Sequence, residues 1–297
     1  MCNSSPMIDW QDLQFFAVLA RTGSLSAAAR ELGVDHATVG RRVASLERTL
    51  SLRLIDRLPR SSPLTAEGSQ IADLAGRFEA LAFAIERRAR EMTGTSTVRI
   101  SGPPAISARL IAPHVADFHE THPEITLVLS GSSQTVALDR GEADLAVRMT
   151  KPEEGYLVVR RIGVMRFALY GTPALASRPA TDWTFIGYDA PLEHVTSQVW
   201  LRSILAGRPI IFQASDLFGQ QEAARAGLGA VVLPRFMGDE DPSLVRLPAT
   251  PGPPTRDLWL AIHPDLKRSV AVRIVMTFLA DVVGRRCPVK GTSQQAG

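Results

Sequence analysis

An arginine cluster near the amino terminus is the group of residues with the clearest chemical use. Between Val39 and Arg60 the chain has six arginines and only two acidic residues, Glu47 and Asp56. A guanidinium donates paired hydrogen bonds to phosphate oxygens or to the O6 and N7 atoms of guanine. The cluster therefore predicts contact with nucleic acid, although many basic helix faces are only solvated. The arginines occupy positions 41, 42, 48, 53, 57 and 60.

The residues around this cluster predict two helices joined by a tight turn, over residues 24–50. Ser24 is a favourable N-cap for the first helix, Gly33 ends that helix, and Asp35 caps the second one. In the second helix, apolar residues recur on one side and small or basic residues occupy the other. The apolar positions are Val39, Val43, Leu46 and Leu50, and the opposite positions are Ala37, Arg41, Ala44 and Arg48. This pattern is typical of a helix-turn-helix, whose second helix enters the DNA major groove.

A short hairpin is expected directly after these helices. Residues 52–58 and 64–65 are predicted to be its strands, and the turn between them contains two prolines. Arg57 and Arg60 would lie near the tip. Such a wing reaches phosphates or the minor groove beside the recognition helix.

The first ninety residues resemble the N-terminal domain of LysR-type transcriptional regulators. The matching stretch is DLQFFAVLARTGSLSAAARELGVDHATVGRRVASLERTLSLRLIDR, followed by PLTAEG. The family often has Ser-Gln-Pro-x-x-Ser-Arg where this chain has His36, Ala37 and Gly40 in place of glutamine, proline and the second serine, with Arg41 kept. Operator sequences of relatives are therefore not expected to transfer. The resemblance implies a winged helix-turn-helix whose recognition helix contacts bases through His36, Ala37, Gly40 and Arg41. Together with the helix face and the wing, the predicted DNA-contacting residues are His36, Ala37, Thr38, Gly40, Arg41, Arg42, Arg48, Arg57 and Arg60.

Length and composition bound the function without specifying it. A chain of 297 residues, 45% of them hydrophobic, suggests about two globular domains. The net charge of +3 is mild, so the basic signal is local. Cys2 and Cys287 lie near opposite ends, which predicts no disulfide and a reducing cytosol. We find no signal peptide and no apolar run of ~18 residues, so we expect a soluble cytoplasmic protein with no membrane partner.

A long helix is expected from residue 65 to about residue 92. Its apolar residues recur at gaps of three and four, which favours a seam between two helices. Packing onto the winged domain would produce the same pattern over so few heptads. In the resembled family this helix joins two subunits, which implies a dimer, with pairs of dimers forming a tetramer. The seam residues are Ile71, Leu74, Phe78, Leu81 and Ile85.

Beyond a small polar hinge at residues 93–96, short apolar strands alternate with helices. This alternation is typical of an α/β domain with a mainly parallel sheet. The expected strands are residues 98–101, 125–130, 144–148, 166–170, 185–188, 210–213, 230–233 and 258–263, and the expected helices are residues 104–120, 133–140, 196–206, 217–226 and 267–283.

Three segments of this region, FHETHPEITLVL, GEADLAVRM and AARAGLGAVVLP, resemble the effector-binding domain of the same family. The resemblance implies two Rossmann-like lobes, as in periplasmic binding proteins, with the chain crossing between them near residues 162–166 and 263–267. We therefore predict a winged helix-turn-helix domain (1–66), a dimerising linker helix (67–93), an effector-binding domain (97–284) and a flexible tail (285–297). Lobe I would comprise residues 97–162 and 268–284, and lobe II residues 163–267.

A small-molecule site is expected where strands end and helices begin. Ligands bind outside the carboxyl ends of strands in open α/β sheets, and helix N-termini favour anions. Arg148 would add a fixed cation, so a small anionic metabolite is predicted. The alternative interpretation is that the serines are plain helix caps and that Arg148 pairs with a structural acid. The candidate effector-binding residues are Ser101, Gly102, Pro103, Ser132, Ser133, Arg148, Ser215 and Asp216.

Other motifs do not favour catalysis. His114, His119 and His122 fall on different helix faces or outside the helix, which argues against a metal site. Gly227-Leu228-Gly229 follows a helix and precedes a strand, the reverse of a dinucleotide fingerprint. No nucleophile elbow is present. We predict a ligand-controlled transcriptional regulator without a cofactor, with RNA polymerase as a further partner. The alternative is a small-molecule binding protein or enzyme with a non-functional N-terminal domain.

Overall fold

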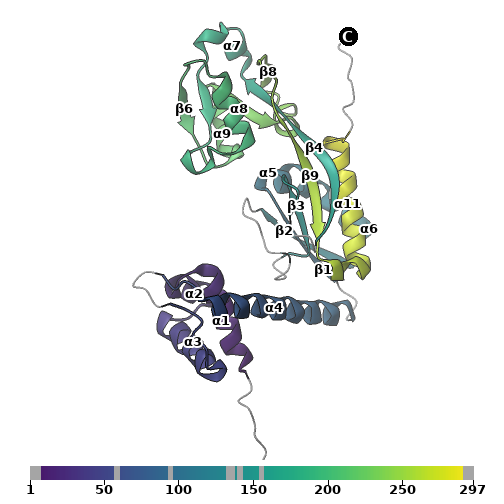
Figure 1. The fold of residues 1–297 in the computed structure, drawn as a ribbon. Helices are drawn as coiled ribbons and strands as arrows, with labels where there is room; N and C mark the ends of the chain where they lie inside the picture. Colours follow the sequence, from purple (N-terminus) through teal and green to yellow (C-terminus); the bar gives the residue numbers. More distant parts are fainter. Residues whose placement is uncertain are drawn as a thin grey trace, which may run out of the picture. The chain divides into compact units, whose positions relative to one another are not determined.

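The computed structural model describes residues 8–56, 61–92, 96–131, 138, 143–153 and 157–289. Backbone contacts divide the chain into an N-terminal unit, Met1–Thr93, and a C-terminal unit that comprises Gly94–Leu138 and Ala143–Gly297. The first unit is helical and the second is an α/β structure (Figure 1). Within the described ranges, every helix is too short or too polar to cross a membrane.

Capping residues define the helices of the N-terminal unit as the sequence predicts. The Ser24 hydroxyl accepts a hydrogen bond from the Ala27 amide at 3.2 Å. Gly33 adopts the left-handed conformation, with φ of +67°, that ends a helix without steric cost. The helices are α1 (Trp10–Thr22), α2 (Leu25–Leu32), α3 (His36–Leu50) and α4 (Ala66–Met92). The predicted helix-turn-helix and the long helix after it are confirmed.

The core of this unit lies among α1, α2 and α3. Phe16, Val39 and Val43 are fully buried there. Trp10, in the first turn of α1, is 54% exposed. Its indole stacks on the Phe78 ring of α4, with the ring centroids 4.4 Å apart and the planes 6° from parallel. Trp10 therefore ties α1 to α4 instead of filling the core.

The wing is present as a short antiparallel pairing. Ile55 and Leu64 form a β-bridge, and the Asp56 amide donates to the Pro63 carbonyl at 2.8 Å. A carboxylate oxygen of Glu47, on α3, accepts from the amide of Leu54 at 2.8 Å. The start of the wing is therefore fixed to the recognition helix. The predicted turn at residues 57–60 lies outside the described residues.

The C-terminal unit contains two groups of parallel strands. We call the part with β2, β1 and β3 lobe I and the part with β6, β5 and β7 lobe II. Their bounds are β1 (Ser96–Gly102), β2 (Ile125–Gly131), β3 (Leu145–Arg148), β5 (Phe185–Gly187), β6 (Ile210–Gln213) and β7 (Ala230–Pro234). Within each group the neighbouring strands are parallel, as predicted.

Two long antiparallel strands join the lobes (Figure 1). β4 (Val158–Gly171) pairs first with β9 (Thr255–Ile262) and then with β7 and the short β8 (Val245–Leu247). The sheet is therefore mixed, not mainly parallel. β4 changes its partner after Arg166: Val158–Arg166 pair with β9, and Phe167–Tyr170 pair with β7 of lobe II. The second crossing between the lobes does not fall at residues 263–267: β9 already pairs with β3 of lobe I from Trp259 to Ile262, so the chain has returned by the first residues of β9.

Helices cover the faces of both lobes. Lobe I is covered by α6 (Val115–Thr121) and α11 (Val270–Arg286), and the lobe II helices are α7 (Pro173–Ala176), α8 (Thr196–Ile204), α9 (Leu217–Arg225) and α10 (Arg235–Gly238). The predicted helix 104–120 is broken into α5 (Pro104–Ile106), a π-helical turn (Ser107–Ile111), a 3-10 turn (Ala112–His114) and α6. Pro113 has no amide hydrogen to donate to the preceding turn, which explains the break. The predicted helix 133–140 lies outside the described residues, apart from Leu138.

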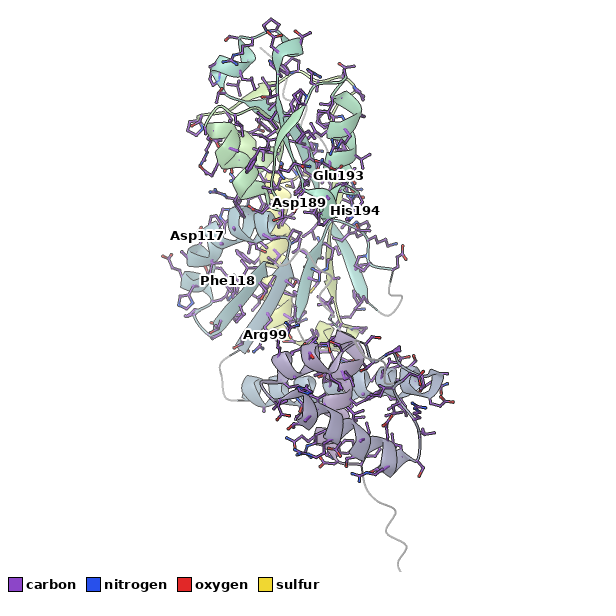
Figure 2. All side chains as sticks on the ribbon, turned by 90° about the vertical axis from the view of Figure 1, so that its left-hand side faces the viewer. Arg99, Asp117, Phe118, Asp189, Glu193 and His194 are labelled. Atoms are coloured by element: carbon purple, nitrogen blue, oxygen red, sulfur yellow. The ribbon has the colours of Figure 1, made fainter. Side chains whose placement is uncertain are left out.

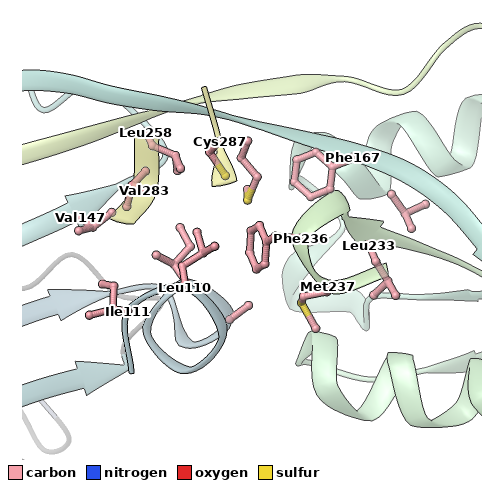
Figure 3. Close-up of a cluster of buried hydrophobic side chains, with 14 of the residues drawn as sticks. Leu110, Ile111, Val147, Phe167, Leu233, Phe236, Met237, Leu258, Val283 and Cys287 are labelled. Atoms are coloured by element: carbon pink, nitrogen blue, oxygen red, sulfur yellow. The ribbon is translucent and has the colours of Figure 1, made fainter. Parts of the chain in front are cut away.

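One apolar core runs through both lobes at the crossing strands (Figure 3). Leu110 and Val283 of lobe I and Phe236 and Leu233 of lobe II belong to the same buried cluster. Phe167 of β4 lies between them in sequence and is also buried. The lobes are therefore joined by packed side chains as well as by the two strands.

Candidate DNA-contacting face and effector site

The outer face of α3 presents predicted DNA-contacting residues to solvent. A Cβ added at Gly40 would have no neighbour within 4 Å, so this stretch of helix is open to close approach. A hollow of about 520 Å³ adjoins the face, and Arg41, Arg48 and Arg53 are among the side chains that line it. The exposed predicted residues are His36, Ala37, Arg41 and Arg48.

The N-terminus of α3 is fixed by its cap. Asp35 accepts from the Thr38 amide at 2.7 Å and from the Thr38 hydroxyl at 2.8 Å. These hydrogen bonds, first of all the one from the hydroxyl, lower the pKa of the Asp35 carboxyl. Arg41 lies one turn later, with Nη2 3.4 Å from the Thr38 hydroxyl oxygen. Thr38 therefore orients both its cap and Arg41, and its own DNA contact stays a prediction.

Arg42 does not belong to the outer face. Its Nη1 atom lies 3.1 Å from Asp12 and 3.5 Å from Asp9, both on or beside α1. Its guanidinium carbon is 5.9 Å from the centroid of the Phe15 ring. The structure thus gives Arg42 an ion pair within the unit instead of the predicted DNA contact. Residues 41 and 42 are about 100° apart around a helix, which suffices to turn one outward and the other toward α1.

The wing contributes one arginine that the site prediction left out. Arg53 is exposed, lines the hollow beside α3, and has its Nε atom 3.8 Å from Asp56. Its presence in the arginine cluster was the only signal in the sequence. Arg57 and Arg60, which the sequence predicts at the tip, lie outside the described residues.

The predicted dimer seam of α4 is largely exposed. Leu74, Phe78, Leu81 and Ile85 are between 37% and 64% exposed, and they follow one another at gaps of three and four. Ile71, at the start of the seam, packs against the core of the N-terminal unit. Contacts within the N-terminal unit therefore cover Ile71 and, through Trp10, one face of the Phe78 ring.

In lobe I the structure brings three candidate effector-binding residues together. Ser101 is buried, and Arg148 places Nη1 3.4 Å from the Ser101 hydroxyl and 3.1 Å from the Val147 carbonyl. Gly102 follows Ser101 at the end of β1, and its carbonyl accepts from the Ser107 hydroxyl at 3.3 Å. Pro103 leads only into the three-residue α5. The helix-dipole effect expected at this end is correspondingly weak, because it grows with aligned peptide units.

In lobe II the predicted anion site has a simpler explanation. Asp216 is the N-cap of α9 and accepts from the Gly219 amide at 2.8 Å. A carboxylate therefore already occupies the position that an anionic ligand would take beside Ser215. Burial and the Asp216 charge together raise the pKa of Tyr188 to about 12. The role of helix cap therefore accounts for Asp216 without a ligand.

Arg256 is a candidate that sequence reasoning missed. It lies on β9, and its Nη2 donates to the Met149 carbonyl at 3.0 Å and to the Thr150 hydroxyl at 2.7 Å, just after β3 of lobe I. Its Nη1 donates to the Thr196 hydroxyl at the start of α8 in lobe II. One guanidinium thus bridges the lobes. No local pattern marks it, since its partners are distant in sequence.

A second missed candidate lies at the border of lobe II. Figure 2 shows Asp189, Glu193 and His194 where lobe II approaches lobe I. One carboxylate oxygen of Asp189 is buried and has no hydrogen-bond partner among the described residues. An unpaired buried acceptor is costly, so a ligand donor there would be stabilised. Ser132 and Ser133 lie outside the described residues, and the described part of the chain holds no cluster of three or more His, Cys, Asp or Glu residues suited to a metal.

Comparison with known proteins identifies relatives for both units. The family model described as "Bacterial regulatory helix-turn-helix protein, lysR family" matches residues 10–69, and "LysR substrate binding domain" matches residues 93–284. The Mau operon transcriptional activator of Paracoccus denitrificans is 29% identical over 284 residues, which cover 93% of this chain and 96% of the relative. The name of this relative describes a transcriptional activator, not an enzyme.

Solved structures share the fold. The LysR-type regulator CrgA of Neisseria meningitidis superposes with a TM-score of 0.56 at 24% identity, over 94% of this chain and 100% of that one. ArgP of Mycobacterium tuberculosis superposes with a TM-score of 0.62 at 22% identity, over 94% and 98% of the two chains. Both are similar to this chain over nearly their whole length.

Proposed function

The chain belongs to the LysR family of bacterial helix-turn-helix transcriptional regulators, and we propose that it reads its operator with the outer face of α3. The observation that carries this proposal is the division of α3 into a buried apolar side and an exposed side that presents Arg41 and Arg48 next to an open hollow. Arg41, one turn from a capped and therefore ordered N-terminus, is suited to paired hydrogen bonds with a guanine.

The α4 stripe supports a dimer. A contiguous row of exposed leucine, isoleucine and phenylalanine side chains is costly in water and is covered when a second α4 packs against it. Two recognition helices joined in this way read half-sites about one DNA turn apart. We further propose that dimers pair into tetramers and contact RNA polymerase in the cytoplasm, where the chromosomal target lies.

The effector-binding domain takes a small molecule in this proposal, with a carboxylate as its recognised group. Support comes from Arg148 beside the buried Ser101 hydroxyl, a combination that offers a cation and a neutral donor to one anionic group. Arg256 connects the two lobes close to the same strand end. A ligand bound there would favour one lobe arrangement over another and so shift the equilibrium between DNA-bound forms. No metal or organic cofactor is involved.

The test is footprinting of the DNA upstream of the protein's own coding region, with and without a panel of small carboxylates at fixed salt. Arg41→Ala should weaken binding to the protected site about ten- to a hundredfold, since a bidentate base contact is worth about 1–3 kcal/mol. Arg178→Ala, which removes an exposed arginine of lobe II, is the matched control and should bind as the wild type does. Equal affinities for the two variants would contradict the assignment of α3.

A further inference from the structure

A cavity of about 290 Å³ lies against the crossing strand β4, away from every residue of the effector site described above. Its walls come from three segments: Val164 and Arg166 of β4, α10 with the two residues after it, and residues 285–288 at the end of α11. Lobe I supplies one wall, lobe II another, and the crossing strand the third.

The walls are held by direct contacts. The Val164 amide donates to the Cys287 carbonyl at 2.8 Å, and Arg166 Nη1 donates to the Pro288 carbonyl at 2.9 Å. Across the cavity, Arg286 and Glu240 form an ion pair at 2.5 Å between the end of α11 and the residues after α10. The cavity is therefore a built feature of the lobe junction.

The charges on the walls do not balance. Four arginines line the cavity against two carboxylates, and both carboxylates are engaged: Asp239 with Arg235 at 3.2 Å, and Glu240 with Arg286. Arg166 donates to two carbonyl oxygens, those of Val164 and Pro288, which are neutral. Arg285 has no ion-pair partner within the described ranges. Two positive charges therefore face this space without a matching anion.

The surroundings strengthen the attraction for an anion. Val164 and Phe236 are buried apolar residues, and they lower the effective dielectric constant beside the half-buried Arg166. Burial raises the pKa of the Cys287 thiol to about 11, so this side chain is neutral near pH 7 and compensates neither arginine. A guanidinium in such a setting binds oxyanions through charge-assisted hydrogen bonds.

We propose that this cavity is a second ligand site, which binds a small oxyanion, carboxylate or phosphate, through Arg166 and Arg285. The site is separate from the proposed effector site, with which it shares no residue. Because its walls belong to both lobes and to the strand between them, an anion bound here stabilises the lobe arrangement that forms the cavity.

Isothermal titration calorimetry on the full chain tests the proposal, with inorganic phosphate and succinate as separate probes in a low-chloride buffer. One anion should bind at this site per chain, and Arg285→Gln should weaken its affinity by about tenfold or more, the loss expected for one charge-assisted hydrogen bond. Arg285 is exposed, so this variant keeps the fold. Arg273→Gln, also on the exposed face of α11 but outside the cavity, is the matched control and should bind as the wild type does.

Each outcome has a definite meaning. If either probe binds the wild type and only Arg285→Gln weakens its affinity, the site is supported. The probe that binds then identifies phosphate or carboxylate as the ligand class. If Arg148→Gln weakens the affinity for the anion and Arg285→Gln does not, the proposal is overturned, and the anion binds at the proposed effector site. Absence of binding, or equal loss in Arg285→Gln and Arg273→Gln, also overturns it. Operator binding without added anion is independent of this result, so the proposed DNA-binding function would stand or fall separately.

Discussion

Replacing Arg42 with methionine is expected to destabilise the N-terminal unit, whereas the same change at Arg41 is expected to impair DNA binding alone. Asp12, the partner of Arg42, is 3% exposed, and its carboxylate has no other ion pair within the described residues. Methionine preserves the unbranched stem that packs near Phe15 and has a similar helix propensity. The substitution at residue 42 thus mainly removes a charge and leaves a buried carboxylate without its cation.

The magnitude follows from the geometry. Two unit charges 3.1 Å apart attract by about 5 kcal/mol at an effective dielectric constant of about 20. Removing one partner of a fully buried pair costs about 3–5 kcal/mol, whereas exposed pairs contribute about 0–1 kcal/mol. The Arg42 side chain is one-third exposed, so solvent screens part of the interaction. We therefore expect Arg42→Met to lower the free energy of unfolding of this unit by about 2–3 kcal/mol.

The assay must resolve the N-terminal unit within the full chain. Hydrogen exchange measured by mass spectrometry at increasing urea concentration follows peptides of α1 and α3 separately from those of the C-terminal unit. Arg41→Met, on the exposed face, should change their stability by less than about 0.5 kcal/mol and should weaken operator binding. The reasoning is refuted if Arg42→Met leaves exchange in α1 and α3 unchanged and weakens operator binding as Arg41→Met does.

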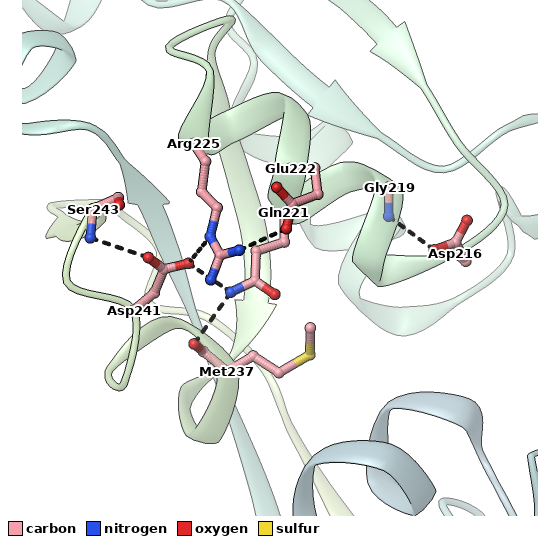
Figure 4. A network of polar contacts seen from close by, with 8 residues as sticks. All are labelled: Asp216, Gly219, Gln221, Glu222, Arg225, Met237, Asp241 and Ser243. Atoms are coloured by element: carbon pink, nitrogen blue, oxygen red, sulfur yellow. Dashed lines mark hydrogen bonds and ion pairs between the residues drawn. The ribbon is translucent and has the colours of Figure 1, made fainter.

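Three further perturbations test other parts of the fold. A Cβ at Gly238 would lie 2.3 Å from the buried Tyr170 ring, so Gly238→Ala should cost about 1–3 kcal/mol, seen as a lower Tm; an unchanged Tm would contradict the close packing. Burial would raise the pKa of Asp241, but hydrogen bonds, first from Arg225, outweigh it and hold that pKa below 3.8 (Figure 4). Because the folded-state pKa is the lower one, this stabilisation is present above pH 3.8 and is lost as the pH falls further. Asp241→Asn should therefore reduce stability to denaturant at pH 7 and by less at pH 3; an equal effect at both would argue against the ion pair. Leu81→Glu should convert dimers to monomers in sedimentation velocity, and an undisturbed dimer would place the interface elsewhere.

The parts of the fold that depend on neighbouring residues could be predicted. The caps at Ser24 and Asp35 and the stop at Gly33 act within one helical turn, and the structure places them as expected. The same holds for the exposed side of α3 and for most strands of the two parallel groups, whose apolar runs are short and bounded by polar residues. The sequence also contained the signal for the break in the predicted helix 104–120, because Pro113 lies within that range.

The DNA-contacting face and the effector site depend more on contacts between residues distant in sequence, so only some of their residues could be predicted. Arg41 and Arg42 are indistinguishable in type, and only the position of Asp12, thirty residues away, turns one of them inward. Asp216 could be read as a ligand contact until its hydrogen bond to the Gly219 amide showed it to be a cap. Arg256 contacts Met149 and Thr150, which precede it by more than a hundred residues. No local pattern in the sequence reveals such contacts.

Read alone, the chain specified most of its secondary structure, its helix-turn-helix and an α/β domain, because caps, turns and hydrophobic periodicity are properties of short stretches. The division of that domain into two lobes was implied only by the family resemblance. Only the folded molecule decided that β9 returns to lobe I beside β4, that Arg42 neutralises Asp12, and that the end of α11 closes a cationic cavity against the crossing strand. These features rest on hydrogen bonds and charges between segments far apart in sequence, whose pairing is set by how the whole core packs.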